Sequence, residues 1–165
     1  MIEPAPVFSR PAAPEAPAPK ASVRLPFDAR RKRHQAVTLD DGRAAWIVLE
    51  RLERPLEDGD RLASDEGEVV VVRAADEALL QVRATGAALA RCAYHLGNRH
   101  ALVEVIEGGL RTPADPVMRQ MLAQLGADVV EVAAPFRPEI GAYHHEHDHH
   151  HGPGKIHRFV MTPRP

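Results

Sequence analysis

Residues 77–132 alternate between strand-like and helix-like apolar patterns, and this succession constrains the fold more than any other feature. Continuous or alternating apolar runs predict strands, whereas apolar residues three and four positions apart predict helices. The order is strand, helix, strand, strand, helix, strand. The segments are 79–82, 85–96, 101–106, 110–112, a helix from 116, and 129–132. This order predicts two helices on one face of an antiparallel sheet, the ferredoxin-like arrangement.

The first predicted helix carries a single apolar stripe. Thr85 is a suitable N-cap, and Gly97-Asn98 should end the helix, with Gly97 in the left-handed conformation that glycine adopts without a steric penalty. The stripe, at positions i, i+3, i+4 and i+7, consists of Leu89, Cys92, Ala93 and Leu96.

The second predicted helix has clearer boundaries. Asp115 is a good N-cap, Pro116 suits the first helical position, and Gly126 should follow the last turn. We expect its buried stripe to consist of Val117, Met118, Met121, Leu122 and Leu125.

Residues 22–75 predict a small all-β domain. Strand-like residues 37–39 and 45–49 flank Asp40-Asp41-Gly42, which is typical of a hairpin turn, and 69–72 predict a buried strand. Dense prolines before residue 21 predict an extended or disordered arm, because proline removes backbone donors. The expected α+β organisation is a disordered arm over 1–21, the β-rich domain over 22–75, the ferredoxin-like domain over 76–140 and a histidine-rich tail over 141–165.

Composition argues against several classes of function. The 165 residues carry a net charge of −2 with histidine neutral, which does not favour nucleic acid or a membrane surface as a partner. The predicted sheet also lacks the stacking aromatics of RNA-binding domains with this order. Because no apolar run reaches membrane-span length and no signal-peptide core is present, we expect a soluble, cytoplasmic protein. The one cysteine, Cys92, should be a buried core thiol.

Histidines supply the candidate ligands. His100 lies just past the first predicted helix, and residues 144–151 comprise six histidines and two carboxylates. Neutral imidazole is the commonest protein metal ligand. His95 lies on the polar side of its helix, where we expect a solvated or hydrogen-bonded ring. The candidate metal ligands are His100, His144, His145, His147, His149, His150, His151 and His157.

A single imidazole does not retain a divalent ion against water, so His100 needs further ligands. A two-fold homodimer would bring the same residue of each chain to the axis, and the tail could add imidazoles from either chain. A flexible tail permits exchange, whereas a rigid four-ligand site holds its metal. Imidazole ligation by itself accepts Ni²⁺, Zn²⁺ and Cu²⁺.

Other interpretations compete with this one. The tail alone could serve as a passive buffer for divalent metals. A metal-dependent hydrolase would need closely spaced histidines and carboxylates on rigid elements, and the dense run here lies in the tail, so we expect no enzymatic activity. The basic run 30–33 could dock an acidic partner, but we favour a solvated surface.

Several segments resemble the urease accessory nickel metallochaperone family, UreE. The most specific is His-Leu-Gly-Asn-Arg-His at 95–100, preceded by Leu-Ala-Arg-Cys-Ala-Tyr at 89–94. Pro-Glu-Ile-Gly-Ala-Tyr at 138–143 runs into the histidine-rich tail, and segments 30–33 and 37–42 also match. The resemblance covers about residues 22–151.

The resemblance implies a dimeric, non-enzymatic chaperone that binds Ni²⁺ at His100 of both chains, with tail histidines completing or loading the site. It implies the urease apoprotein and its accessory complex, including a GTPase, as partners, and a β-rich domain that binds peptide or a partner protein. The chain departs from the family pattern twice. Residues 112–116 lack the histidines that some relatives carry there, and the tail continues beyond its histidine run to His157.

Overall fold

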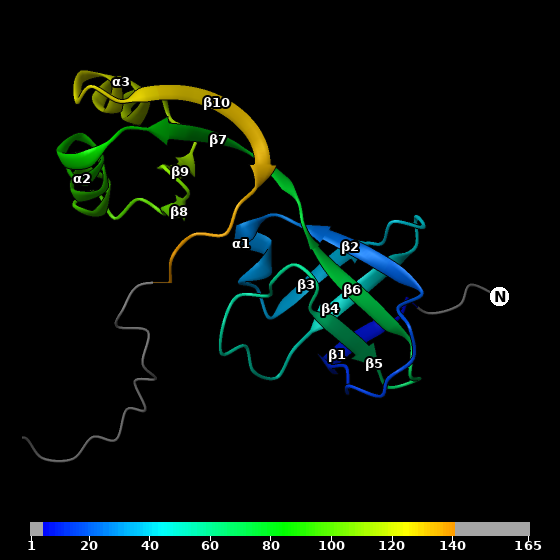
Figure 1. The fold of residues 1–165 in the computed structure, drawn as a ribbon. Coiled ribbons are helices and arrows are strands. Elements are labelled where there is room, and N and C mark those ends of the chain that lie inside the picture. The colour runs from blue at the N-terminus through cyan, green and yellow to red at the C-terminus, as the bar shows by residue number, and fades with distance from the viewer. Residues whose placement is uncertain (1–4, 141–165) are drawn as a thin grey trace, which may run out of the picture.

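The computed structural model describes residues 5–140, which form two β-sheets with separate cores (Figure 1). The first sheet has six strands in the order β2-β6-β5-β1-β4-β3. Two of its strand pairs, β2 with β6 and β1 with β4, are parallel, and the others are antiparallel. The elements are β1 (Val7–Pro11), β2 (Ala21–Leu25), α1 (Phe27–Arg30), β3 (His34–Thr38), β4 (Ala44–Val48), β5 (Arg61–Ser64) and β6 (Val69–Ala74).

The first sheet curves into a near-barrel because its two edge strands are joined at one end. The Asp40 N–H, just after β3, donates to the Ser22 carbonyl of β2 at 2.9 Å. In return the Ser22 N–H and hydroxyl each donate to a carboxylate oxygen of Asp40 at 2.8 Å. One aspartate thus links the two edges of the sheet.

Strand alternation explains the core of this sheet. β3 and β4 form the hairpin predicted around residues 40–42. In β4, Ala45 and Ile47 are buried while Trp46 and Val48 are exposed, as expected when successive side chains point to opposite faces. The predicted buried strand at 69–72 is also confirmed, because Val70 and Val72 are fully buried.

The prediction of a disordered arm over residues 1–21 is wrong for β1. This strand lies inside the sheet, parallel to β4 and antiparallel to β5, and Phe8 is 0% exposed in the core. The prolines that suggested disorder flank the strand or end it at Pro11, so they do not interrupt residues 7–10. A buried aromatic residue therefore outweighs the proline-rich composition.

The second sheet has the predicted succession of strands and helices. Its four antiparallel strands lie in the order β10-β7-β9-β8, and side chains of both helices share one core cluster with β7 and β9. The third predicted element is shorter than expected, since only its last three residues are paired. The elements are β7 (Asp76–Arg83), α2 (Gly86–Gly97), β8 (Glu104–Ile106), β9 (Gly109–Pro113), α3 (Pro116–Gln124) and β10 (Asp128–Pro135).

α3 begins where the sequence predicts, but its buried apolar stripe contains fewer residues than expected. The Asp115 carboxylate accepts a hydrogen bond from the Met118 N–H at 2.7 Å, and Pro116 occupies the first turn. Leu122 is fully buried, whereas Val117 is 71% exposed and was wrongly assigned to the core. Val117 lies about a quarter of a turn from the centre of the packed stripe. No helix within residues 5–140 has the length and apolarity to cross a membrane.

Candidate metal centre

His100 lies at the C-terminal end of α2 in a left-handed backbone conformation. Its φ is +53°, the one positive φ at a non-glycine residue in the described part of the chain. The His100 N–H donates to the Gly97 carbonyl at 2.9 Å, and the Ala101 N–H donates to the Leu96 carbonyl at 3.1 Å. These two bonds define a Schellman helix ending, in which the left-handed position is usually glycine.

The prediction that Gly97 takes the left-handed conformation is wrong. Gly97 is the last residue of α2, and the left-handed residue comes three positions later. A histidine in that conformation costs about 1–2 kcal/mol, because Cβ crowds the following carbonyl oxygen. Burial of Leu96, packed with Ala101 in the same core cluster, holds the motif in place. Strain of this kind persists where the surrounding structure fixes it, and it is commonest at functional sites.

The His100 side chain is exposed, and its ring makes no hydrogen bond with any residue in the range 5–140. Within that range, no three His, Cys, Asp or Glu side chains form a group that could hold a metal ion. The other candidate ligands lie outside the described residues. They are His144, His145, His147, His149, His150, His151 and His157.

His95, in the last turn of α2, has a more constrained position than His100. Its ring is half-buried and lies edge-on to the Tyr94 ring, with centroids 5.4 Å apart and planes at 80°. Its carbonyl accepts a hydrogen bond from Arg99 at 3.1 Å. That His95 is not a ligand stays a prediction.

The outer face of α2 consists mainly of small apolar residues, with the exposed Arg91 at its edge. Positions three and four apart on a helix share one side, so the residues of this face form a continuous strip that runs to the C-terminal end of α2, where His100 follows. The tyrosine of the strip is 65% exposed. We define the outer face of α2 as the exposed residues Ala87, Ala90, Ala93, Tyr94 and Gly97. The prediction that Ala93 belongs to the same stripe as Leu89, Cys92 and Leu96 is therefore wrong, because only the other three pack in the core.

The glycine in this face is not required by its own chain. Its φ is not positive, and a Cβ added at Gly97 would meet nothing within 4 Å. Glycine inside a helix costs about 1 kcal/mol relative to alanine. The fold of one chain therefore gives no reason for Gly97.

The last described residues, Glu139 and Ile140, lie beside the segment that follows His100, and we call them the root of the tail. After β10 the chain turns back, and the Glu139 N–H donates to the Val103 carbonyl at 2.7 Å. Val103 is three residues past His100, and Ile140 is the last described residue. Sequence reasoning missed this contact, because no local pattern connects positions so far apart in the chain.

Cys92 is a buried core thiol, as predicted. It is 0% exposed, and burial raises the pKa of its thiol. Metal ligation and nucleophilic attack both need the thiolate, which burial disfavours.

The interpretation of the basic run 30–33 as solvated is wrong for its first residue. Arg30 is 2% exposed, whereas the other three residues of the run are exposed. Its hydrogen-bond partners, Leu56 and Phe136, are 26 and 106 residues away. A local sequence pattern does not reveal contacts at such separations.

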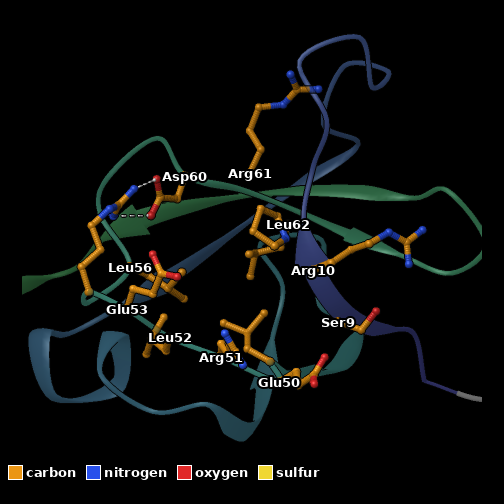
Figure 2. A pocket seen from close by; sticks show the side chains of 13 residues that line it. Ser9, Arg10, Glu50, Arg51, Leu52, Glu53, Leu56, Asp60, Arg61 and Leu62 are labelled. Carbon is orange, nitrogen blue, oxygen red and sulfur yellow. Dashed lines mark hydrogen bonds and ion pairs between the residues drawn. The ribbon is translucent and has the colours of Figure 1, made fainter. Parts of the chain in front are cut away.

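A cavity of about 480 Å³ lies in the first sheet, between β1, β5 and the loop 49–60 (Figure 2). Arg54 and Asp60 form a bidentate pair at its rim, with N–O distances of 2.9 and 3.0 Å. Burial raises the pKa of Asp60, but the Arg54 hydrogen bonds, the Glu57 N–H and the charge of Arg54 together outweigh it, so the pKa of Asp60 is lowered. The apolar part of the lining is Pro11, Leu49, Leu52, Leu56 and Leu62.

Comparison with known proteins gives matches over both sheets. Residues 8–75 match the model of the UreE urease accessory protein N-terminal domain, and 77–159 match that of the C-terminal domain. The chain is 50% identical over 131 residues to the urease accessory protein UreE of Burkholderia pseudomallei strain 1710b, covering 79% of this chain and 64% of that protein. It is 45% identical over 131 residues to UreE of Nitrosococcus oceani, covering 76% and 78%. The chain thus spans less than two thirds of the length of the Burkholderia relative.

Proposed function

Because this chain belongs to the UreE urease accessory protein family, a family of accessory proteins and not of enzymes, we propose that it is a nickel metallochaperone. Two chains related by a two-fold axis share one Ni²⁺ through their His100 side chains. Tail histidines load the site, and the metal is passed on for assembly of the urease active site.

This proposal rests mainly on the backbone conformation and the exposure of His100. An exposed imidazole occupies a strained backbone position at the end of a helix, where glycine is the usual residue. The two helix-ending hydrogen bonds fix the backbone of His100, while its exposed ring stays free to meet a metal ion.

The outer face of α2 supports the two-fold axis. An exposed apolar strip beside the candidate ligand is typical of an interface, and aromatic residues such as Tyr94 are enriched at interface centres. Close approach of a second helix would also explain Gly97, which its own chain does not require. A two-fold interface built on this face turns one imidazole into two.

The root of the tail supports loading from the same chain. The Glu139–Val103 hydrogen bond fixes the last described residues beside the segment that follows His100. His144 is five residues beyond Glu139, a span of at most about 18 Å for an extended chain. The run 144–151 therefore has the length to bring imidazoles to His100. His157 is a candidate further ligand of the same kind.

The cargo is Ni²⁺, and Zn²⁺ or Cu²⁺ would compete at imidazole ligands. Family membership supports the choice of nickel and the expected partners, which are the urease apoprotein and its accessory complex with a GTPase. We expect this exchange to take place in the cytoplasm. Imidazole binds metal only when deprotonated, so affinity should fall below about pH 6. An affinity that stays flat between about pH 5 and 8 would instead indicate carboxylate ligands.

The alternative function is a passive buffer of divalent metals that uses the tail alone. Calorimetric titration with Ni²⁺ distinguishes the chaperone from the buffer. The variants are His100→Ala and a deletion of residues 144–151, and His34→Ala is the control, because His34 is also an exposed histidine. A chaperone loses its tight step, about one ion per dimer, in His100→Ala and keeps weaker tail binding. A buffer loses nearly all binding in the deletion and almost none in His100→Ala.

A further inference from the structure

Arg30, the last residue of α1, is a buried cation between the two sheets. Its side chain is 2% exposed. One terminal nitrogen donates to the Leu56 carbonyl at 3.1 Å, and the other donates to the Phe136 carbonyl. Leu56 belongs to the loop 49–60 of the first sheet, and Phe136 follows β10 of the second. One guanidinium thus joins the two halves of the chain.

The main chain of Arg30 fixes the same loop a second time. The Leu56 N–H donates to the Arg30 carbonyl at 2.9 Å, and the Arg30 N–H donates to the Pro26 carbonyl at 3.0 Å. Leu56 is therefore held through both its N–H and its carbonyl group. The loop that lines the 480 Å³ cavity cannot move away from α1 without breaking both bonds.

Aromatic packing completes the junction. The Arg30 guanidinium lies 5.3 Å from the centroid of the Phe27 ring. That ring meets Phe136 edge-on at 5.9 Å and 76°, and both belong to a small cluster with Leu79 of β7. The Phe27 N–H donates to the Glu77 carboxylate at 2.8 Å, a further link between the sheets.

The buried charge has no carboxylate within ion-pair distance among residues 5–140. Burial lowers the pKa of Arg30, although the more distant charges of Glu77, Asp58 and Glu57 oppose that shift. A buried cation whose hydrogen bonds go only to carbonyl groups contributes little to stability compared with an apolar residue of similar size. What arginine provides is a rigid fork that reaches two acceptors at once, which lysine lacks.

We propose that Arg30 is an interdomain lock, which fixes the second sheet at one orientation to the first. The lock connects the cavity-lining loop with the end of β10, and so with the segment that runs from Phe136 to the root of the tail. A partner bound at the cavity would be held at a constant position relative to His100. This inference is independent of the metal that His100 binds.

Distance measurements between spin labels test the lock. Labels at Thr38→Cys on β3 and Gln124→Cys on α3 lie on exposed positions, one in each half of the chain. The buried Cys92 should not react. Labelled protein is diluted with unlabelled protein, so that only distances within one chain are measured. Arg30→Met keeps an apolar stem of similar length without donors. Arg31→Met is the control, because Arg31 lies 5.7 Å from the same Phe27 ring but is exposed.

The unmodified chain and Arg31→Met should each give one narrow distance distribution, and Arg30→Met should give a broad one. Equal distributions in Arg30→Met and the unmodified chain would overturn the lock, as would a broad distribution in the unmodified chain. If Arg30→Met does not fold, the same distance is measured in Arg30→Lys. Its ammonium lacks the planar fork that spans the two carbonyls, so it should broaden the distribution, and a narrow one would count against the lock.

Discussion

His100 of α2 and Gly126 of α3 occupy the same position of the same helix-ending hydrogen-bond pattern. The N–H of each donates to the carbonyl three residues earlier, at 2.9 Å and 3.0 Å, and the next N–H donates five residues back, at 3.1 Å and 3.2 Å. Their φ angles are +53° and +85°. The chain therefore places an imidazole where its other long helix has the glycine that the motif favours.

Glycine should stabilise the protein at position 100, and its loss should destabilise the protein at position 126. His100→Gly should be about 1 kcal/mol more stable than His100→Ala, because only glycine adopts the left-handed conformation freely. Gly126→Ala should cost about 1 kcal/mol, a purely backbone effect, since its Cβ would meet nothing within 4 Å. Urea denaturation of metal-free protein at one protein concentration measures both. Equal stability of the two His100 variants would show that the position is unstrained.

The outer face of α2 should tolerate no charge if it forms the two-fold interface. Ala90→Asp should shift the protein to monomer and remove the tight Ni²⁺ step, because a buried unpaired carboxylate is strongly unfavourable. Ala123→Asp is the matched control, an exposed alanine on α3. Sedimentation with and without Ni²⁺ gives the oligomeric state. A dimer that persists in Ala90→Asp would place the interface elsewhere.

Asp40 should make the stability of the near-barrel depend on pH. The backbone N–H of Ser22, and then its hydroxyl, lower the pKa of Asp40. A lowered pKa in the folded state means that the stabilisation is complete above the unfolded value of about 3.9 and is lost as pH falls through the lower folded value. Asp40→Ala should therefore be less stable than the unmodified chain at pH 7, and the difference should shrink as pH falls below about 3.9. A difference that persists in acid would assign the effect to packing.

Cys92 should be inert in the folded protein. It is fully buried, and burial raises the pKa of its thiol, so the reactive thiolate is disfavoured. A thiol reagent such as dithionitrobenzoate should label almost none of it natively and all of it in denaturant. Labelling of folded protein at the rate of a free thiol would contradict the packing of α2 on its sheet.

The sequence predicted the elements that local pattern determines. The succession over residues 77–132 and the Asp115-Pro116 start of α3 are confirmed, since hydrophobic period and capping are local properties. Phe8 and Arg30 were missed, because their roles depend on contacts with distant parts of the chain. The left-handed residue was misplaced because α2 continues through Gly97.

The candidate site was only partly accessible to sequence reasoning. His100 was selected by residue type and by its place at a helix end, and the structure adds its strained backbone and the apolar strip that leads to it. The contact of Glu139 with Val103 has no sequence signal. Ligation by His100 and by the tail histidines stays a prediction, because the tail lies outside residues 5–140.

Anomalous diffraction at the nickel edge, from crystals of the full chain loaded with Ni²⁺, tests the shared site most directly. The account predicts a nickel peak on a two-fold axis, with an imidazole nitrogen of His100 from each of two chains at about 2 Å. Nickel found only among tail residues, or two His100 rings far apart in the dimer, would contradict it.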